Sequence, residues 1–475
     1  MPANSTHPDY DASAQHWSRA RDVLAGEDAV KAAGERYLPR LDSQTEEEYA
    51  AYKARASFFG ATGRTLEEYL DLIFRRAPVL ALGGGEQLKK FVADCDWWGL
   101  DFLRYARRVV SEVLAVGRVG SLVLWEESGR PVVSVWRAED IVNWTVERVG
   151  QGVALVEVVL RDAGRLRVLR LGDVEREASS VERGESGPLG SGDGAFGESA
   201  LPDAAASLNS AGCVQEIWKK GADDWVLEER VILKRDGVPL SFIPFVFHGP
   251  RDSRPEPVRL PLADIIAANL DHYRLDADYK HGLHFTALPT AWVSGFDKDA
   301  PLRIGSSAAW VSEVPGASAG FLQFPGTGLG HIERAMEKVE RRIALFGARM
   351  LEGSTGGQAT GVPATSGGNG HLCGLGSIVA SLNQSLSRVL QLAQWWVEGG
   401  ELDAQAGKVG FAMDTDLGAR AMSGEEITAV VGAWRAGAIS RETMLERLKR
   451  GEVLPDGRTV AQERTLVHGK NHETH

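Results

Sequence analysis

The spacing of apolar residues alternates between two periods along this chain, and that alternation limits the fold more than any other feature. Up to about residue 117, and again after residue 257, apolar residues recur every three or four positions, which is typical of amphipathic helices. Between about 119 and 233 they form short runs joined by turn residues, which is typical of antiparallel strands. Helices and strands that occupy separate stretches predict an α+β fold with an antiparallel sheet in its middle part.

Local chemistry sets several element boundaries. In a capping box, a Ser or Thr and a Glu three residues later bind free backbone N–H groups at the start of a helix. Such boxes are predicted at Thr45, Thr65 and Ser423, and Ser440 is predicted to cap one more short helix. Three hairpins are predicted, with paired strands at 121–125 and 132–136, at 153–160 and 166–171, and at 214–218 and 226–233.

Two stretches carry too few apolar side chains to form a core. Residues 175–212 are rich in Gly, Ser, Ala and acidic residues, and we expect a mobile surface insertion there. Residues 352–370, EGSTGGQATGVPATSGGNG, predict a loose segment. Because Gly368 and Gly370 come at the end of this glycine-rich segment and do not follow a strand, a dinucleotide-binding turn is disfavoured.

Two long helices are predicted on either side of residues 287–328, which themselves read as short strands broken by Gly and Pro. Residues 260–286 carry two basic and four acidic side chains, whereas residues 329–350 carry five basic and three acidic ones. A charged helix with a narrow apolar stripe is poorly stable alone, so we expect neighbouring copies to cover its second face. The stripe of the first helix is Leu262, Ile266, Leu270, Tyr273 and Ala277, and that of a third helix at 376–398 is Ile378, Leu382, Leu386, Val389, Ala393 and Trp396.

Composition argues against several classes of protein. The 65 acidic and 53 basic residues give a net charge of -12, which disfavours a protein that grips DNA through its phosphates. Cys95, Cys213 and Cys373 are far apart and form no zinc motif, which indicates a reducing compartment. The polar N-terminus predicts no signal peptide, and no apolar run approaches the roughly 20 residues of a membrane helix. We therefore expect a protein made and used in the cytosol.

No residue pattern indicates an enzyme or a cofactor. The phosphate-binding pattern GxxxxGK[ST] and the nucleophile pattern GxSxG are both absent. The acid pairs Asp94/Asp96 and Asp414/Asp416 leave open a hydrolase with acidic catalytic residues. Solvated loop acids are the favoured interpretation because nothing else in the sequence marks a catalytic pocket.

Two further side-chain groups could bind a ligand. His281 and His284 share a helix face and could hold a metal with a nearby carboxylate, but no further ligand is identifiable and a structural role is favoured. The Trp pairs at 97–98 and 395–396 are interpreted as core and interface anchors, because base-stacking aromatics usually lie among basic residues.

The order of several sequence blocks resembles a group of tailed-bacteriophage portal proteins. The runs RARDVLAGEDAVKAAGERYLPRL and EEYAAYKARASFFGATGRTLEEYLDLIFRRAP are similar to the opening of these proteins. EVLAVGRVGSLVLW, RAEDIVNW, IPFVFHG and PLADIIAANLDHYRLDADYKHGLHFTALPT follow in the expected order, and AWRAGAISRETMLERL is similar to the end of many portals. The ordered set covers nearly the whole chain and is specific, whereas no single block is.

The resemblance implies a portal-type fold whose parts follow one another along the chain. It consists of a wing made of helices and an antiparallel sheet, a two-helix stem, a small α/β clip and a helical crown. The implied parts are the wing at 1–255, stem helix one at 256–286, the clip at 287–328, stem helix two at 329–351, a tunnel loop at 352–371, a long wing helix at 372–400 and the C-terminal wing and crown helices at 401–475.

The resemblance also implies a function without catalysis, cofactor or membrane. Such a protein forms a ring, usually of twelve subunits, at one capsid vertex, and double-stranded DNA passes through it during packaging and ejection without sequence-specific binding. Expected partners are the terminase large subunit, a tail adaptor protein, and the major capsid and scaffolding proteins. The ring would be assembled in the bacterial host cytoplasm and end in the virion. Another adaptor or scaffolding protein of head assembly stays open as an alternative, beside the hydrolase.

Two sets of site residues follow as hypotheses. The tunnel loop near the DNA would include Thr355, Gly356, Gly357, Gln358 and Thr360. The stem charges would lie near the channel or pair between neighbouring copies, with Arg341, Arg342 and Arg349 facing Asp271, Asp276 and Asp278.

Overall fold

The computed structural model shows an α+β protein with antiparallel sheets, as the alternating periods predict. The contacts divide the chain into two compact units. The first unit consists of Met1–Arg21, Thr65–Ala263 and Gly347–His475, and the second of Asp22–Arg64 and Asp264–Phe346. The structure describes residues 5–83, 85–126, 129–149, 152–173, 211–221, 224–287, 290–297, 310–322, 326–352, 374–405, 407–415, 417, 422–451, 453–454 and 460–470.

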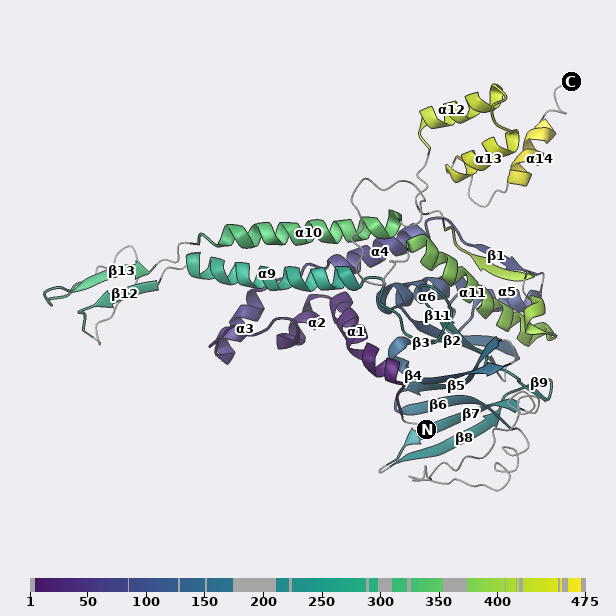
Figure 1. Ribbon diagram of the computed structural model, residues 1–475, viewed down its shortest axis with the longest axis horizontal. Helices are drawn as coiled ribbons and strands as arrows, with labels where there is room; N and C mark the ends of the chain where they lie inside the picture. The colour runs from purple at the N-terminus through teal and green to yellow at the C-terminus, as the bar shows by residue number, and fades with distance from the viewer. Residues whose placement is uncertain are drawn as a thin grey trace. The chain divides into compact units, whose positions relative to one another are not determined.

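A five-stranded antiparallel sheet in the first unit contains its strands in chain order (Figure 1). The hairpins β5–β6 and β7–β8 confirm two of the three predicted pairs. Residues 175–210 of the predicted insertion lie outside the described residues, and Ala211 already begins β7. The strands are β4 (Ile141–Val149), β5 (Gly152–Asp162), β6 (Arg165–Asp173), β7 (Ala211–Lys220) and β8 (Trp225–Ile232). One face is covered by a cluster of Val142, Val159, Leu166, Val168 and Trp218.

A three-stranded sheet, in the order β11–β2–β3, forms the second layer of this unit. β2 (Val119–Glu126) and β3 (Arg130–Arg137) are the third predicted hairpin, and β11 (Phe245–His248) pairs with β2. Helix α6 (Phe102–Val116) packs on this sheet and ends at Gly117, which has a left-handed backbone with φ of 77°. A side chain at Gly120 of β2 would overlap the Phe245 ring, so the two strands can approach only because this residue is glycine.

Helix α11 (Leu375–Glu398) packs against β2, β3 and β11, and it confirms the amphipathic helix predicted at 376–398. Fifteen of its residues are buried, including the whole predicted stripe. Next to it, β1 (Val79–Leu82) pairs with β14 (Val409–Ala412), which joins segments about 330 residues apart. Neither strand was predicted from the sequence. The short strands β9 (Lys234–Arg235) and β10 (Val238–Pro239) form a separate tight hairpin.

The N-terminal hundred residues are mainly helical, as predicted. The helices are α1 (Pro8–Ala25), α2 (Glu27–Ala32), the 3-10 turn η1 (Gly34–Arg36), α3 (Glu46–Arg55), α4 (Ala61–Ile73) and α5 (Glu86–Ala93). The capping box at Thr45 is confirmed at the start of α3.

The capping box predicted at Thr65 is wrong, because α4 begins four residues earlier and Thr65 lies inside it. The cap comes from Asn269, 207 residues further along the chain. Its Oδ1 accepts hydrogen bonds from the Thr62 N–H at 3.0 Å and the Thr62 hydroxyl at 2.9 Å, and its Nδ2 donates to the Phe59 carbonyl at 2.5 Å. A side chain from a distant helix can bind the free backbone N–H groups of the first turn as a local cap would. The sequence next to α4 therefore needs no capping residue.

The second unit contains two long helices joined by a small hairpin. Helix α9 (Ala263–Ala287) and helix α10 (Leu329–Glu352) run side by side, and β12 (Thr290–Ser294) pairs with β13 (Ser318–Leu322) beyond their ends (Figure 1). Both predicted helices and the strand-like character of 287–328 are confirmed where this stretch is described.

The C-terminal helices form a small cluster of their own. They are α12 (Gly424–Arg435), α13 (Arg441–Arg450) and α14 (Val460–Lys470), preceded by a 3-10 turn η4 (Leu402–Gln405). Ser423 forms the predicted capping box and Ser440 caps α13 as expected. Among the described residues, Met444, Leu445 and Leu448 form the buried centre of the cluster.

Candidate functional site

The candidate site is the helical hairpin α9–β12–β13–α10 of the second unit. Along α10, the buried residues Val339 and Ile343 form a narrow stripe, each with 7% of its surface exposed. Near the middle of the pair, His272 Nε2 lies 3.1 Å from Glu340 Oε1, which joins the two helices across the seam. At the hairpin end, a Cβ on Gly282 would lie 2.6 Å from Leu329, so the helices approach more closely there than a larger residue would allow.

Helix α3 and the segment after it contact the second half of α9. Tyr52 donates its hydroxyl to Asp278 Oδ1 at 2.6 Å, and burial, helped by this bond, raises the pKa of Tyr52. Asp276 Oδ2 accepts the Ser57 N–H at 2.6 Å and lies 3.2 Å from Lys280 Nζ. Asp276 and Asp278 therefore both have partners within their own chain.

The remaining predicted stem charges lie on the surface of this unit. Asp271 forms an ion pair with Arg274 at 3.0 Å one turn away. Arg341 pairs with Glu337 at 3.2 Å on its own helix, and the Arg342 guanidinium lies 5.9 Å from the centre of the Phe346 ring. Arg349 is exposed. Within one chain the structure thus brings none of these three arginines to the three aspartates among the described contacts, and their pairing between copies stays a prediction.

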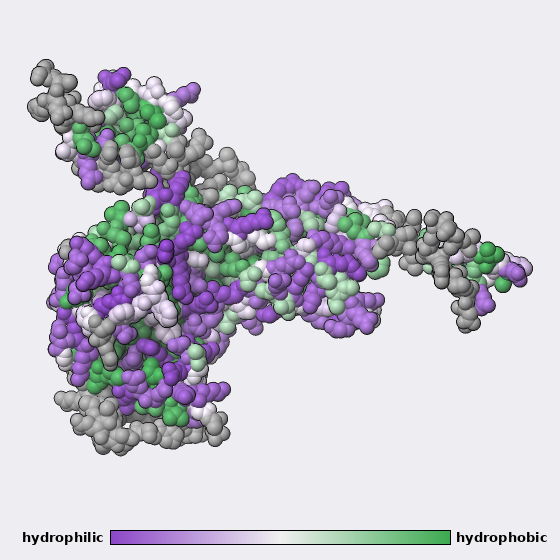
Figure 2. Space-filling view, turned by 180° about the vertical axis from the view of Figure 1, so that it is seen from behind, coloured by the Kyte–Doolittle hydropathy of each residue, from purple (hydrophilic) through white to green (hydrophobic). Residues whose placement is uncertain are grey.

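The far end of the hairpin exposes large apolar side chains. The exposed fraction reaches 54% for Phe321 and 69% for Leu322 on β13, and 81% for Val311 in the segment before it. The Trp292 indole of β12 lies over Gly320, where a Cβ would be 2.9 Å from its nitrogen, yet Trp292 is still 45% exposed. Figure 2 shows apolar residues at this end of the molecule. Leu283 and Phe285, on the last turns of α9, are exposed apolar side chains as well.

The candidate metal-binding histidines of α9, His281 and His284, make aromatic contacts. The His281 ring packs edge-on against Tyr52 at 5.2 Å and against Phe285 at 4.7 Å, and the His284 ring packs edge-on against Phe285 at 5.5 Å. Partial burial, followed by the charge of Arg55, lowers the pKa of His281. In the part of the chain that the structure describes, no group of three or more His, Cys, Asp or Glu side chains could hold a metal ion.

The acid pair Asp94/Asp96 shapes a turn. Asp94 Oδ1 accepts the N–H groups of Trp97 and Gly99, and its other oxygen pairs with Arg130 at 2.8 Å, which holds the pKa of Asp94 below its usual range. Asp96 accepts two more N–H groups of the same turn. These carboxylates serve backbone donors and do not converge on a cavity.

The second acid pair is only partly described. Asp414 forms an ion pair with Arg76, and Asp416 lies outside the described residues. The tunnel-loop residues Thr355, Gly356, Gly357, Gln358 and Thr360, and the glycines at 368 and 370, also lie outside them. Of the two Trp pairs, Trp395 and Trp396 are buried anchors, whereas Trp98 is 92% exposed.

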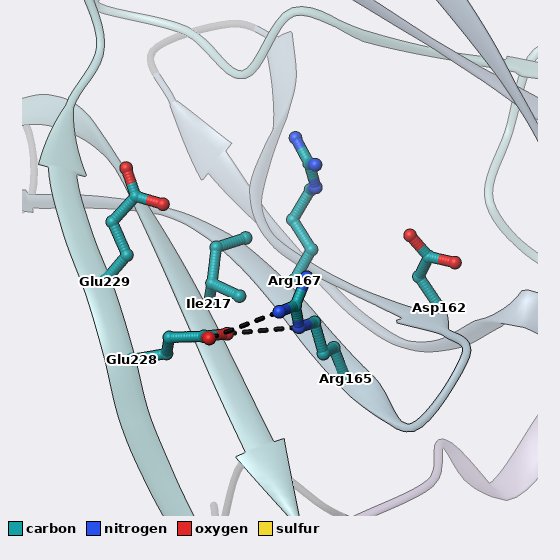
Figure 3. Close-up of a pocket in the computed structure, with 6 residues that line it drawn as sticks. All are labelled: Asp162, Arg165, Arg167, Ile217, Glu228 and Glu229. Atoms are coloured by element: carbon teal, nitrogen blue, oxygen red, sulfur yellow. Dashed lines mark hydrogen bonds and ion pairs between the residues drawn. The ribbon is translucent and has the colours of Figure 1, made fainter.

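A charged hollow of about 440 Å³ lies on the five-stranded sheet (Figure 3). Glu228 pairs there with Arg165 at 3.1 Å, and Asp162 lies on the opposite side of the arginines (Figure 3). Arg167 donates to Gln215 at 3.0 Å, and burial lowers the pKa of Arg167. Acidic and basic side chains alternate across the strands, which stabilises the sheet face through cross-strand pairs.

Sequence reasoning missed a buried polar chain in the first unit. Tyr105 Oη, Ser121 Oγ and His248 Nε2 are linked at 2.5 and 2.6 Å, and His248 Nδ1 lies 2.8 Å from Ser385 Oγ. Burial lowers the pKa of His248 to about 3, so the ring is neutral. All four side chains are buried. None of them lines the charged hollow on the five-stranded sheet or the open groove beside Ser253 and Arg254. The chain therefore joins α6, β2, β11 and α11, and no motif in the sequence marks it.

No helix in the described part of the chain combines the length and the apolar character that crossing a membrane requires.

Comparisons with known proteins give matches at low identity. No curated protein matches this chain. Among solved structures, a chain from the neck of an empty gene transfer agent (GTA) particle with C6 symmetry is similar at 13% identity and a TM-score of 0.39, over 83% of this chain and 90% of that one. A chain from the virion of the native particle gives 13% and 0.38, over 91% and 99%. One from its neck with C12 symmetry gives 14% and 0.38 over the same shares.

One family also matches part of the chain. It is described as "Domain of unknown function (DUF4055)" and matches residues 261–397. This match covers α9, the β12–β13 hairpin, α10 and nearly all of α11. The segment that the family shares is therefore the one that contains the candidate site.

Proposed function

We propose that this protein is a portal-type subunit, which assembles with identical copies into a ring around a DNA channel. The observation that carries the proposal is the second unit, a pair of long helices whose far end exposes large apolar side chains on a two-stranded hairpin. A single two-stranded hairpin is marginally stable in water at best, and it leaves both strand edges unpaired. Copies arranged around an axis would cover these edges and side chains.

The energetics support assembly through this end. Fully burying one aromatic or large aliphatic side chain contributes about 1.5–3 kcal/mol. Seven such side chains, each more than a third exposed, lie within the described part of residues 283–322, and even partial burial would exceed the usual cost of ordering them. They are Leu283, Phe285, Trp292, Val311, Val314, Phe321 and Leu322.

The finer parts of the proposal rest on the sequence resemblance. The helices and sheets of 1–255 would be the wing, 256–286 and 329–351 the stem, 287–328 the clip that meets the terminase large subunit and a tail adaptor, and 401–475 the wing edge and crown. The ring would have twelve subunits and sit in the virion. The net charge of -12 suits a channel that lets DNA slide without gripping it.

The tunnel loop is a proposal from the sequence alone. Its residues carry no charge between Gly353 and His371, so the loop could lie beside DNA without binding it tightly. Deleting 356–368 is expected to leave rings intact and to impair DNA packaging or retention. Collapse of the ring on this deletion would contradict the assignment.

The ring itself is tested by mass photometry and negative-stain electron microscopy of the purified full chain. We expect one closed oligomer with a central hole. The double substitution Phe321→Asp and Leu322→Asp should shift it to monomers, whereas Val226→Asp, at a 56% exposed position on β8, is the matched control and should keep the ring. A compact monomer at tens of micromolar would overturn the proposal.

A further inference from the structure

Arg118 is a buried cation without a hydrogen-bond partner. It follows Gly117 at the end of α6, is only 2% exposed, and has all three guanidinium nitrogens buried with no acceptor among the described residues. Its guanidinium lies 4.0 Å from the centre of the Trp144 ring and 5.1 Å from that of Phe247. Burial lowers the pKa of Arg118 to about 9.

The two rings serve only the faces of this guanidinium. Cation–π contacts stabilise the charge above and below its plane, but its five N–H donors point outward within that plane. A buried charged donor without an acceptor destabilises the folded state by far more than an exposed one, because its hydration is lost without replacement. Arg118 therefore calls for a carboxylate at its edge.

Two carboxylates, Glu256 and Asp9, act on Arg118 through their charge, and Glu256 has the larger effect. Asp9 belongs to the first turn of α1 and already lies 3.7 Å from His7, whose ring stacks on Trp144. Glu256 is exposed and has no hydrogen bond or ion pair among the described residues. Of the two, Glu256 is the carboxylate with the freedom to move.

Glu256 lies on a connector, residues 249–262, which we name the strap. The strap contains Pro255, Pro257 and Pro261 and leads from β11 to α9. Its backbone lies against the residue before Arg118, because the Val258 carbonyl is 3.3 Å from where a Cβ of Gly117 would be. The strap therefore contacts the backbone at the residue next to Arg118.

The strap also has room to move. An open groove of about 870 Å³ is lined by Ser253, Arg254 and Pro255 of the strap, and by Phe247, one of the two rings on Arg118. A segment that borders open space on one side and a buried cation on the other can shift by a short distance without breaking a sheet or a helix.

We infer that the strap has a second, closed position in which the Glu256 carboxylate accepts hydrogen bonds from the Arg118 guanidinium. This pair forms a latch between the core of the first unit and the connector that leads into α9. The latch replaces the missing acceptor of Arg118 and fixes the strap at the start of the first long helix. It does not depend on ring formation.

The latch is tested by a double-mutant cycle on the full chain, with Glu256→Gln and Arg118→Met, followed by urea unfolding. We expect Glu256→Gln to shift the folding equilibrium toward the unfolded state about tenfold when Arg118 is present and less than about twofold in Arg118→Met. Equal effects in both backgrounds would overturn the latch. A coupling between Asp9→Asn and Arg118→Met, in place of the one between Glu256→Gln and Arg118→Met, would also overturn the latch.

A second measurement does not require Arg118→Met to fold. Trypsin can cut the strap after Arg251 and Arg259, and the rate of these cuts under native conditions reports how often the strap opens. Glu256→Gln should speed the cut after Arg259 several-fold, whereas Asp252→Asn removes one negative charge from the same strap, seven residues away from Arg259, and should leave that cut unchanged. Unchanged cutting in Glu256→Gln, or equal acceleration in both variants, would overturn the proposal.

Discussion

Helices α11 and α10 are each 24 residues long, yet the extent to which their surfaces are buried within one chain differs. α11 has fifteen buried residues and packs against three strands of the second sheet. α10 is buried along one narrow stripe, while charged residues and Leu345, which is 48% exposed, occupy the rest of its described surface. Within one chain, α11 is mostly buried, whereas most of the described surface of α10 stays exposed.

The largest expected effect would show this contrast directly. Leu386→Ala on α11 removes a fully buried side chain and should destabilise the isolated subunit by about 2–5 kcal/mol in urea unfolding. Leu345→Ala on α10 is the matched truncation at an exposed position and should cost less than about 0.5 kcal/mol. Equal losses of stability would show that α10 is packed as fully within one chain as α11, which would contradict the difference between the two helices.

Acid should weaken the packing around α11 through His248, whose ring contacts Ser385 of this helix. The pKa of His248 is about 3 in the folded chain and about 6.5 when unfolded. Below pH 6.5 the unfolded state therefore binds a proton at His248 that the folded state does not. The contribution of His248 to stability falls as the pH drops from 6.5 toward 3 and is constant below that. Between pH 6.5 and 5 we expect a loss of about 2 kcal/mol.

His248→Gln separates this effect from the titration of other groups. The variant should be less stable at pH 7, because a ring hydrogen bond is lost, but its unfolding free energy should vary less between pH 7 and 5. A parent and a variant with the same pH slope would show that His248 does not titrate as its burial predicts.

The first half of α9, like α11, is largely buried within one chain. Asn269 is fully buried and caps α4, so Asn269→Ala should cost about 1–2 kcal/mol in thermal or urea unfolding. Thr65→Ala, at the position where the sequence predicted a cap, should lose clearly less. A larger loss at Thr65 would mean that the local capping box contributes after all.

The smallest effect concerns the stem charges. Arg341→Ala breaks only an exposed pair within α10 and should change subunit stability by less than about 0.5 kcal/mol. If Arg341 pairs with Asp271 of a neighbouring copy, the same substitution should lower the salt concentration at which rings dissociate. Unchanged salt dependence would remove Arg341 from the subunit contact.

What the sequence could predict depended on the range of the interaction. Thr45, Ser423 and the three hairpins were predicted correctly because each element depends on residues a few positions apart. The cap on α4 and the β1–β14 pair were missed because their partners lie hundreds of residues away. The unpaired Arg118 and the His248 chain also had no local signal, since burial arises only when several elements pack together.

The β1–β14 pair has a consequence for synthesis on the ribosome. β1 emerges early, but its partner at Val409–Ala412 is made only when most of the chain has been translated. Until then, the inner edge of β1 and the neighbouring part of α11 lack their natural cover. A chain released before residue 412 would therefore expose apolar surface that proteases and chaperones recognise.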